Sequence, residues 1–209
     1  LPIYENSAGE KNKWKWLSET YPAIAKYLEQ FSADAEIRYD KGDYWWELRA
    51  CDYYPEFEKP KMMLPDISLR SNFSIDKDGI FYCVNTAYII GKYDLFLIGV
   101  LNSRLISLYY RMISPIFRGG YLRFIYQYLI QIPIRTIDFT NPKDVARHDR
   151  MVSLVETMLD LNKKLDNAKL GSEKEMIQRR IDATNDAIDK LVYELYGLSA
   201  KEIAIVESS

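Results

Sequence analysis

Residues 93–113 read YDLFLIGVLNSRLISLYYRMI, a stretch in which apolar residues recur at helical spacing. We predict one continuous helix that ends before Ser114-Pro115, because proline cannot continue a helix. Arg104 and Arg111 fall on another face of this helix, about 10 Å apart along its axis, and can touch a common extended partner. The predicted apolar stripe consists of Leu97, Ile98, Leu101, Leu105, Leu108 and Met112.

The segment that follows this helix is rich in arginine, glycine and aromatic residues. Residues 114–124 read SPIFRGGYLRF. The glycine pair predicts a flexible or tightly turned loop that presents Arg118, Tyr121 and Arg123.

Charge is distributed unevenly along the chain. The 209 residues contain 28 Lys and Arg against 30 Asp and Glu, which gives a net charge of −2. Between Asp94 and Asp138, however, the charged residues are all arginines, and the segment carries +5. Unpaired guanidinium groups that lie close together repel one another, so such a cluster indicates an anionic partner. Their planar forks match phosphate oxygens and the guanine edge. The five are Arg104, Arg111, Arg118, Arg123 and Arg135.

Two interpretations of this arginine run stand side by side. For any single arginine, a solubilising polar face is the simpler explanation. For the run as a whole, we predict a nucleic-acid surface in which arginines reach phosphates or guanines and the glycines let the backbone come close. Of the tyrosines, only Tyr121 is predicted to contact a base. The predicted DNA-binding residues are Arg104, Arg111, Arg118, Gly119, Gly120, Tyr121 and Arg123.

The segments before residue 93 alternate between helical and strand-like patterns. Residues 21–31 predict a helix with Ile24, Tyr27, Leu28 and Phe31 facing inward, and residues 44–50 alternate as a strand requires. Residues 61–64 and 67–69 are candidate strands that the flanking prolines place away from the centre of a sheet. Residues 73–75 and 80–84 predict a hairpin, with Gly79 supplying a positive φ in its turn.

Two long antiparallel helices are expected after residue 140. Asn141 is a predicted N-cap with Pro142 at the first helical position, and Gly171 is expected to close this helix. Residues 172–175 predict a capping box for the second helix, which Gly197 ends, and Ser199 with Glu202 predicts a third, short helix. The predicted fold class is therefore α+β: a small mixed or antiparallel sheet within residues 1–140, followed by a helical hairpin within residues 141–209.

The sequence lacks the usual parts of an enzyme. Cys51 and Cys83 form no CxxC pair, His148 is the single histidine, and there is no phosphate-binding glycine loop or nucleophile beside a plausible base. We expect no catalytic residue, no metal and no cofactor in this chain. The longest apolar run, Leu95–Leu101, is far short of the roughly 20 residues of a membrane span, so we expect a soluble, cytoplasmic protein without a membrane partner. The first residues, LPIYENSAGE, lack an initiator Met and suggest a piece of a longer protein.

The order of features resembles the C-terminal specificity domain of TaqI-type adenine DNA methyltransferases and of fused restriction-modification enzymes. It is also similar to the target-recognition domains of type I specificity subunits. The resemblance runs over about residues 20–207, in collinear order. It is carried by WELR at 46–49, FEKPK at 57–61, Phe73 with 76–81, LNS at 101–103 with Leu105 and Tyr109, GG at 119–120, IPI at 132–134, and IDKLVYELYGL at 188–198 with Glu202 and Ile203.

The resemblance implies a division of labour. A separate N-terminal domain would bind S-adenosylmethionine and methylate adenine at N6, and the parent could also carry an endonuclease. This chain would grip double-stranded DNA and read its sequence, with residues 141–209 as a spacer or docking arm. The net charge implies weak DNA binding by the isolated chain, at low salt only.

Two other functions remain open. The chain could be a helical protein-protein interaction module without DNA binding. An apolar stripe left exposed on the long helices would indicate such pairing, whereas a hairpin that folds on its own core leaves none. A free-standing enzyme ranks third, because its parts are missing.

Overall fold

The computed structural model describes residues 13–47 and 53–209, and the chain divides into two compact units, Leu1–Tyr53 and Tyr54–Ser209. The first unit contains α2 (Lys13–Thr20), α3 (Pro22–Glu29) and α4 (Ser32–Glu36). The helix predicted at residues 21–31 is thus confirmed as α3, with proline in its first turn. Its predicted inward face is wrong: Ala25 is the buried residue, whereas Ile24, Tyr27 and Phe31 are exposed.

The predicted strand at residues 44–50 is also wrong where the structure describes it. Residues 44–47 form turns, and residues 48–50 lie outside the described part of the chain. The rings of Trp45 and Trp46 both pack on Trp14, with centroid distances of 4.8 and 5.0 Å. Two adjacent side chains that contact the same ring cannot alternate between the two faces of a strand.

The second unit begins with a short helix and a small sheet. Its first elements are α5 (Tyr54–Phe57), β1 (Lys61–Pro65), β2 (Ile67–Ser68), β3 (Ser74–Asp76) and β4 (Ala87–Ile90). The three-stranded sheet has the order β3-β1-β4, and both neighbours run antiparallel to β1. Strand β1 is therefore central, and the prediction that prolines keep it from the centre is wrong. Pro65 is its last residue, so it interrupts little of the ladder.

The predicted hairpin of residues 73–84 is wrong, because residues 80–84 form no strand. The backbone N–H groups of Ile80 and Phe81 donate instead to the Asp76 carboxylate, at 3.3 and 2.9 Å. The positive φ of Gly79 is confirmed at +65°, and a Cβ there would lie 2.3 Å from the carbonyl oxygen of Glu58. The chain passes on to β4, which the sequence pattern had not indicated.

A buried ion pair fixes this end of the sheet. The Lys61 ammonium donates to the Asp76 carboxylate and to the carbonyl of Phe57, and both charged side chains are almost wholly buried. Burial by itself would raise the pKa of Asp76. The hydrogen bonds from Lys61, Phe81 and Ile80 outweigh that effect and lower the pKa from 3.8 to about 2.

The helix predicted over residues 93–113 is two helices, α6 (Leu95–Leu101) and α7 (Arg104–Ile113). Asp94 and Ser103 are their N-caps, accepting from Leu97 N and Ile106 N. The second N-cap starts a new helix, so the prediction of one continuous helix is wrong. Of the predicted apolar stripe, Leu97, Ile98, Leu101 and Leu105 do lie in or against the core. Tyr110 is fully buried, whereas Met112 is 77% exposed.

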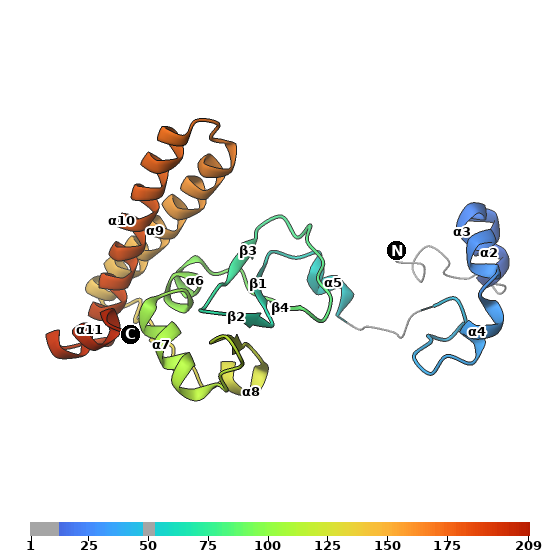
Figure 1. The fold of residues 1–209 in the computed structure, drawn as a ribbon, viewed down its shortest axis with the longest axis horizontal. Helices are drawn as coiled ribbons and strands as arrows, with labels where there is room; N and C mark the ends of the chain where they lie inside the picture. The colour runs from blue at the N-terminus through green and yellow to red at the C-terminus, as the bar shows by residue number, and fades with distance from the viewer. Residues whose placement is uncertain (1–12, 48–52) are drawn as a thin grey trace. The chain divides into compact units, whose positions relative to one another are not determined.

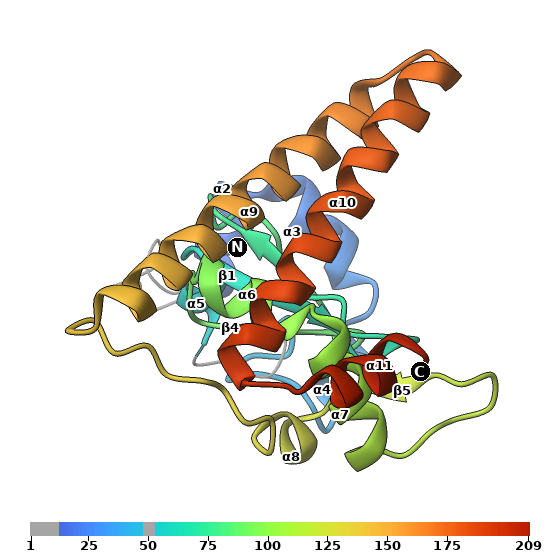
Figure 2. The ribbon, with the colours of Figure 1, turned by 90° about the vertical axis from the view of Figure 1, so that its left-hand side faces the viewer.

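The rest of the unit consists of β5 (Leu122–Arg123), α8 (Tyr126–Leu129), α9 (Pro142–Asn167), α10 (Gly171–Tyr196) and α11 (Ala200–Glu207). Strand β5 pairs antiparallel with β2. In Figures 1 and 2, α9 and α10 run side by side as a long hairpin, with one end against the α6–α7 region and the tip extending away.

The predicted caps of the helical region are confirmed in three places and wrong in two. Asn141 caps α9, Gly197 ends α10 in the left-handed conformation, and Ser199 with Glu202 forms a capping box on α11. Gly171, however, is the first residue of α10, and its N-cap Leu170 makes no side-chain bond, so no capping box forms at residues 172–175. Helix α9 ends earlier, because Ala168 is extended.

One hydrophobic core joins the sheet, α6, α7 and the base of the hairpin, which confirms the α+β fold class. Further along the hairpin, a second small core lies between the two helices. The functional division at residue 140 stays a prediction, since the packing divides the chain at residue 53. The shared core includes Met62, Leu64, Val100, Leu101, Ile106, Tyr110, Phe124, Met151, Val155, Leu191 and Val192.

Gly99 allows a close approach of α6 to α9. A Cβ at this position would lie 2.5 Å from Met151 Sδ and 2.9 Å from Val155 Cγ2. We expect Gly99→Ala to lower the free energy of unfolding by about 1–3 kcal/mol, because the extra methyl overpacks the core. Urea unfolding followed by circular dichroism measures this, with Gly171→Ala as control, since nothing lies within 4 Å of a Cβ there. Equal stability of the two variants would contradict the tight contact.

The Lys61–Asp76 pair predicts a dependence of stability on pH. The folded pKa of Asp76 is depressed, so its contribution is complete above the ordinary value of 3.8 and is lost as the pH falls towards about 2. We expect Asp76→Asn to be less stable near neutral pH by about 3 kcal/mol, because Lys61 stays buried without its counter-charge. The difference from the unmodified chain should shrink between about pH 4 and pH 2.

Urea unfolding at a series of pH values checks this prediction. Asp78→Asn, in the same turn but exposed, is the matched control. A stability difference for Asp76→Asn that stays constant across the acid range would contradict the role of the pair.

Candidate nucleic-acid interface

The arginine–glycine segment forms a tight turn, as the sequence predicts. Phe117 N donates to Tyr121 O at 2.8 Å, and Gly120 N donates to Phe117 O at 3.0 Å. Gly119 and Gly120 have φ of +87° and +81°, values that residues with a Cβ rarely adopt. The turn is closed by a bridge between Ile116 and Leu122, the first residue of β5. The backbone of this segment thus places Arg118 near the tip.

Tyr121 covers the glycine side of the turn. A Cβ at Gly119 would lie 3.3 Å from the Tyr121 ring, so the ring passes close to the backbone. Tyr121 as a whole remains 43% exposed. An exposed aromatic face supported by backbone is able to stack on a base or to pack on a sugar.

The structure separates the predicted arginines into two groups. Arg104 pairs with Asp186 and Asp189, and Arg123 pairs with Asp66 at 3.2 Å. Arg135, outside the predicted site, pairs with Asp144. The premise that all five guanidinium groups lack acidic partners is therefore wrong for three of them. Their carboxylates lie elsewhere in the sequence and reach the arginines through the fold.

Two of the predicted arginines have no carboxylate partner. Arg118 is exposed and makes no hydrogen bond or ion pair within the described residues. Arg111 is also exposed, and its Nη2 donates only to the carbonyl of Leu69, at 3.3 Å. These two positive charges remain available to an anion. Arg111, Arg118, Tyr121 and the glycine turn are the part of the predicted site in which no carboxylate neutralises the positive charge.

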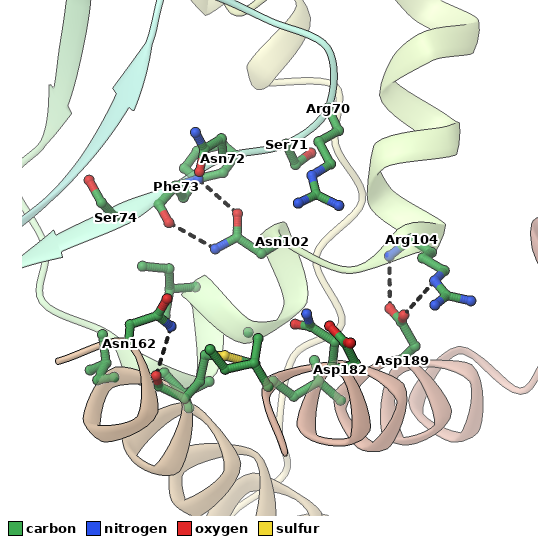
Figure 3. Close-up of a pocket in the computed structure, with 18 of the residues that line it drawn as sticks. Arg70, Ser71, Asn72, Phe73, Ser74, Asn102, Arg104, Asn162, Asp182 and Asp189 are labelled. Atoms are coloured by element: carbon green, nitrogen blue, oxygen red, sulfur yellow. Dashed lines mark hydrogen bonds and ion pairs between the residues drawn. The ribbon is translucent and has the colours of Figure 1, made fainter. Parts of the chain in front are cut away.

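Arg104 has a structural partner on the helical hairpin. Its backbone N donates to Asp189 Oδ1 at 2.8 Å, and its Nε lies 3.1 Å from Asp189 Oδ2. Burial raises the pKa of Asp189 despite the opposing effect of Arg104. Figure 3 shows this pair at the start of α7, facing α10. Arg104 thus stabilises a charge that would otherwise be buried alone.

The β2–β3 loop is held against α6 and α7 by side-chain hydrogen bonds. Asn102 Oδ1 accepts from Phe73 N at 2.7 Å, and its Nδ2 donates to Phe73 O at 2.8 Å (Figure 3). Ser71 N donates to Ser107 Oγ at 3.3 Å. With the contact of Arg111 to Leu69, this loop is fixed at three of its residues. The sequence gives no sign of these contacts, since their partners lie 29 to 42 residues away.

A groove of about 800 Å³ lies between this loop and the helical hairpin. Arg70 lines one side of it, and the opposite side is α10, with Asp182, Asn185 and Asp186. Figure 3 shows Arg70 extending from the loop into the groove. The carboxylates on the α10 side would repel a polyanion, so the groove as a whole is unsuited to DNA.

A smaller hollow of about 340 Å³ lies on the other side of the same loop. It is lined by Ile67, Ser68, Leu69, Arg70, Asn72 and Tyr121. No carboxylate lines it, and Tyr121 belongs to the predicted site. This hollow therefore extends the predicted site onto β2 and the loop that follows it.

The described residues show no metal-binding group. No cluster of three or more His, Cys, Asp or Glu side chains occurs among them, and the thiol of Cys83 is free. Cys51 lies outside the described residues. Within the same described range, none of the helices combines the length and the apolar character that crossing a membrane requires.

The family model of the TaqI-like C-terminal specificity domain matches residues 10–134, more than half of the chain. The chain belongs to this family. It is also similar to two bacterial proteins, the type II methyltransferase M.XhoI of Xanthomonas vasicola and the type II methyltransferase M.BstVI of Geobacillus stearothermophilus. Identity is 28% over 193 residues and 23% over 197 residues. These matches cover 90% and 91% of this chain but 30% of each relative.

The Arg104–Asp189 pair yields a prediction for this TaqI-like specificity domain. We expect Arg104→Ala to lower the free energy of unfolding by about 1–3 kcal/mol, because the Asp189 carboxylate stays buried without its guanidinium partner. Arg180→Ala, on the exposed side of α10, is the matched control and should change stability little. Urea unfolding at neutral pH measures both. If Arg104→Ala were as stable as the control, the pair would not hold α7 to α10.

Proposed function

We propose that this chain is the DNA target-recognition part of a restriction-modification methyltransferase. The observation that carries the proposal is the family match over residues 10–134. The arrangement of charge in the second unit supports it, since uncompensated arginines and an exposed tyrosine surround a tight glycine turn. Such a turn can enter a groove of the duplex, where phosphate contacts position the protein and base contacts specify the sequence.

The proposed DNA surface has a centre and two flanks. At its centre are Arg111, Arg118 and Tyr121, with the backbone of Gly119 and Gly120 able to approach the DNA closely. Arg104 and Arg123 lie at the flanks in this proposal, and carboxylates already offset part of their charge. The centre therefore supplies most of the attraction to phosphate.

The reaction itself belongs, in this proposal, to a separate domain of the same parent chain. The chain spans 30% of the length of the two methyltransferases to which it is similar. We propose that the parent's remaining part binds S-adenosylmethionine and methylates adenine at N6, and that it could be accompanied by a nuclease. A base that is methylated must leave the stack, so a second element that holds the flanking pairs has a clear physical role.

The alternative of a helical interaction module has less support. The apolar residues of α9 and α10 pack into the shared core and into the small core of Leu161, Ala168, Ile177 and Ile181. The structure describes every residue of these two helices, and Met176 is the one large apolar residue in them that is exposed. The stripe that would indicate helix pairing with a partner is therefore absent.

DNA binding by the chain can be tested by fluorescence anisotropy with a labelled mixed-sequence duplex. We expect binding at about 50 mM salt that weakens steeply towards physiological salt, as phosphate contacts require. Arg118→Ala should weaken binding about 5- to 10-fold at low salt and reduce the slope of log K against log salt by about 1.

Arg180→Ala is the control for this measurement, because Arg180 is also exposed but lies on α10. Binding that is lost equally in both variants would point to a nonspecific effect of net charge. The absence of any binding to duplex DNA by the unmodified chain, with gel filtration and light scattering showing a dimer, would favour the interaction module.

A further inference from the structure

Arg70 is a guanidinium group that the predicted site did not include. It lies outside the arginine run of residues 94–138, in the β2–β3 loop. Its side chain is exposed and makes no ion pair or hydrogen bond within the described residues. In this respect it matches Arg118, whereas Arg104 and Arg123 have carboxylate partners.

The loop that presents Arg70 is fixed on both sides of it. Leu69 O accepts from Arg111, and Ser71 N donates to Ser107 of α7. Phe73 is held by both polar atoms of Asn102. Backbone order at a contact residue lowers the entropy lost on binding, so a charge presented in this way binds an anion better than one on a free loop.

The loop shares a surface with the predicted site. Arg70, Asn72 and Tyr121 line the same small hollow, whose other walls are Ile67, Ser68 and Leu69. Arg111 contacts the loop from α7. The hollow therefore brings together a cation, an exposed carboxamide and an aromatic ring, the three side-chain types that contact phosphate, the adenine edge and the base face.

The charges around Arg70 decide which side can accept DNA. Arg70 lines both the groove and the hollow. In Figure 3 its side chain extends into the groove, where Asp182 and Asp186 of α10 disfavour a phosphate, so a contact on the hollow side requires this exposed side chain to change rotamer. On the side of the hollow, the nearest acidic group of β1–β2 is Asp66, whose carboxylate is already bonded to Arg123 and Tyr88. A DNA strand is therefore favoured on the hollow side.

We propose that the loop of residues 69–72 is a second DNA-contacting element, in which Arg70 binds a backbone phosphate and Asn72 reads an adenine. The inference rests on the proposed function and extends it to residues outside the arginine run. Asn72 suits the role because its carboxamide is exposed and has no partner within the described residues. The amide N–H of a carboxamide can donate to N7 of adenine while its oxygen accepts from the N6 amino group in the same plane.

The test combines two measurements on the 209-residue chain. Anisotropy titrations with a mixed-sequence duplex compare Arg70→Ala, Arg70→Lys and Asn72→Ala with Arg180→Ala as the matched control. Selection from a randomised duplex pool then gives the preferred sequence of each variant. Circular dichroism and urea unfolding establish that every variant is folded.

Arg70→Ala should weaken binding about 5- to 10-fold at low salt, reduce the salt slope by about 1 and leave the selected sequence unchanged. Arg70→Lys should recover most of the affinity, because a phosphate contact requires charge more than a planar fork. Asn72→Ala should keep the salt slope and lose a preference for adenine at one position of the selected sequence.

Two failures have different meanings. If the unmodified chain binds DNA, Arg118→Ala weakens it, and the loop variants behave as Arg180→Ala does, the second element is overturned while the proposed function stands. If the unmodified chain binds no duplex at any salt concentration, the proposed function fails, and the role of the loop fails with it.

Discussion

The close contact of α6 with α9, which the absence of a side chain at Gly99 permits, joins the sheet and the helical hairpin into one core. Met151 and Val155 of α9 fill the space that a Cβ would take. Because α7 follows directly after the break at Asn102, its position depends on the same contact, and the Arg104–Asp189 pair then ties it to α10. The hairpin is in this sense the frame that holds the loops proposed to contact DNA.

The parts of the fold that were predicted correctly depend on local chemistry. The N-cap at Asn141, the left-handed Gly197 and the capping box at Ser199 each need only residues within one helical turn. The long helices follow from apolar residues that repeat over several turns. The error at residues 93–113 has a specific cause. An apolar period continues through Asn102-Ser103 in the sequence, although Asn102 uses its side chain to hold Phe73.

The sheet and the site could not be predicted in the same way, because their partners are distant in sequence. Strand β1 lies between β3 and β4 since Asp76 binds the N–H groups that a hairpin would need for pairing. Arg104 pairs with Asp189, which is 85 residues away in the sequence, and Arg123 pairs with Asp66, which is 57 residues away. A count of charges along the chain therefore assigned equal availability to arginines that differ in it, since three of the five have carboxylate partners. Arg70 was missed for the same reason, since no run of arginines surrounds it.

The net charge of −2 says little about DNA binding once these pairs are known. The guanidinium groups that remain without a carboxylate on this surface are those of Arg70, Arg111 and Arg118, and the acidic wall of α10 faces the groove on the other side of the loop. Three phosphate contacts give a slope of log K against log salt of about −2.7, or roughly a 40-fold loss between 50 and 200 mM salt. In the proposed function, such a surface would position DNA but hold it weakly by itself. Weak binding of this kind agrees with the proposal that the chain shares the duplex with a separate methyltransferase domain, because tight binding by the reading domain alone would retain the methylated product.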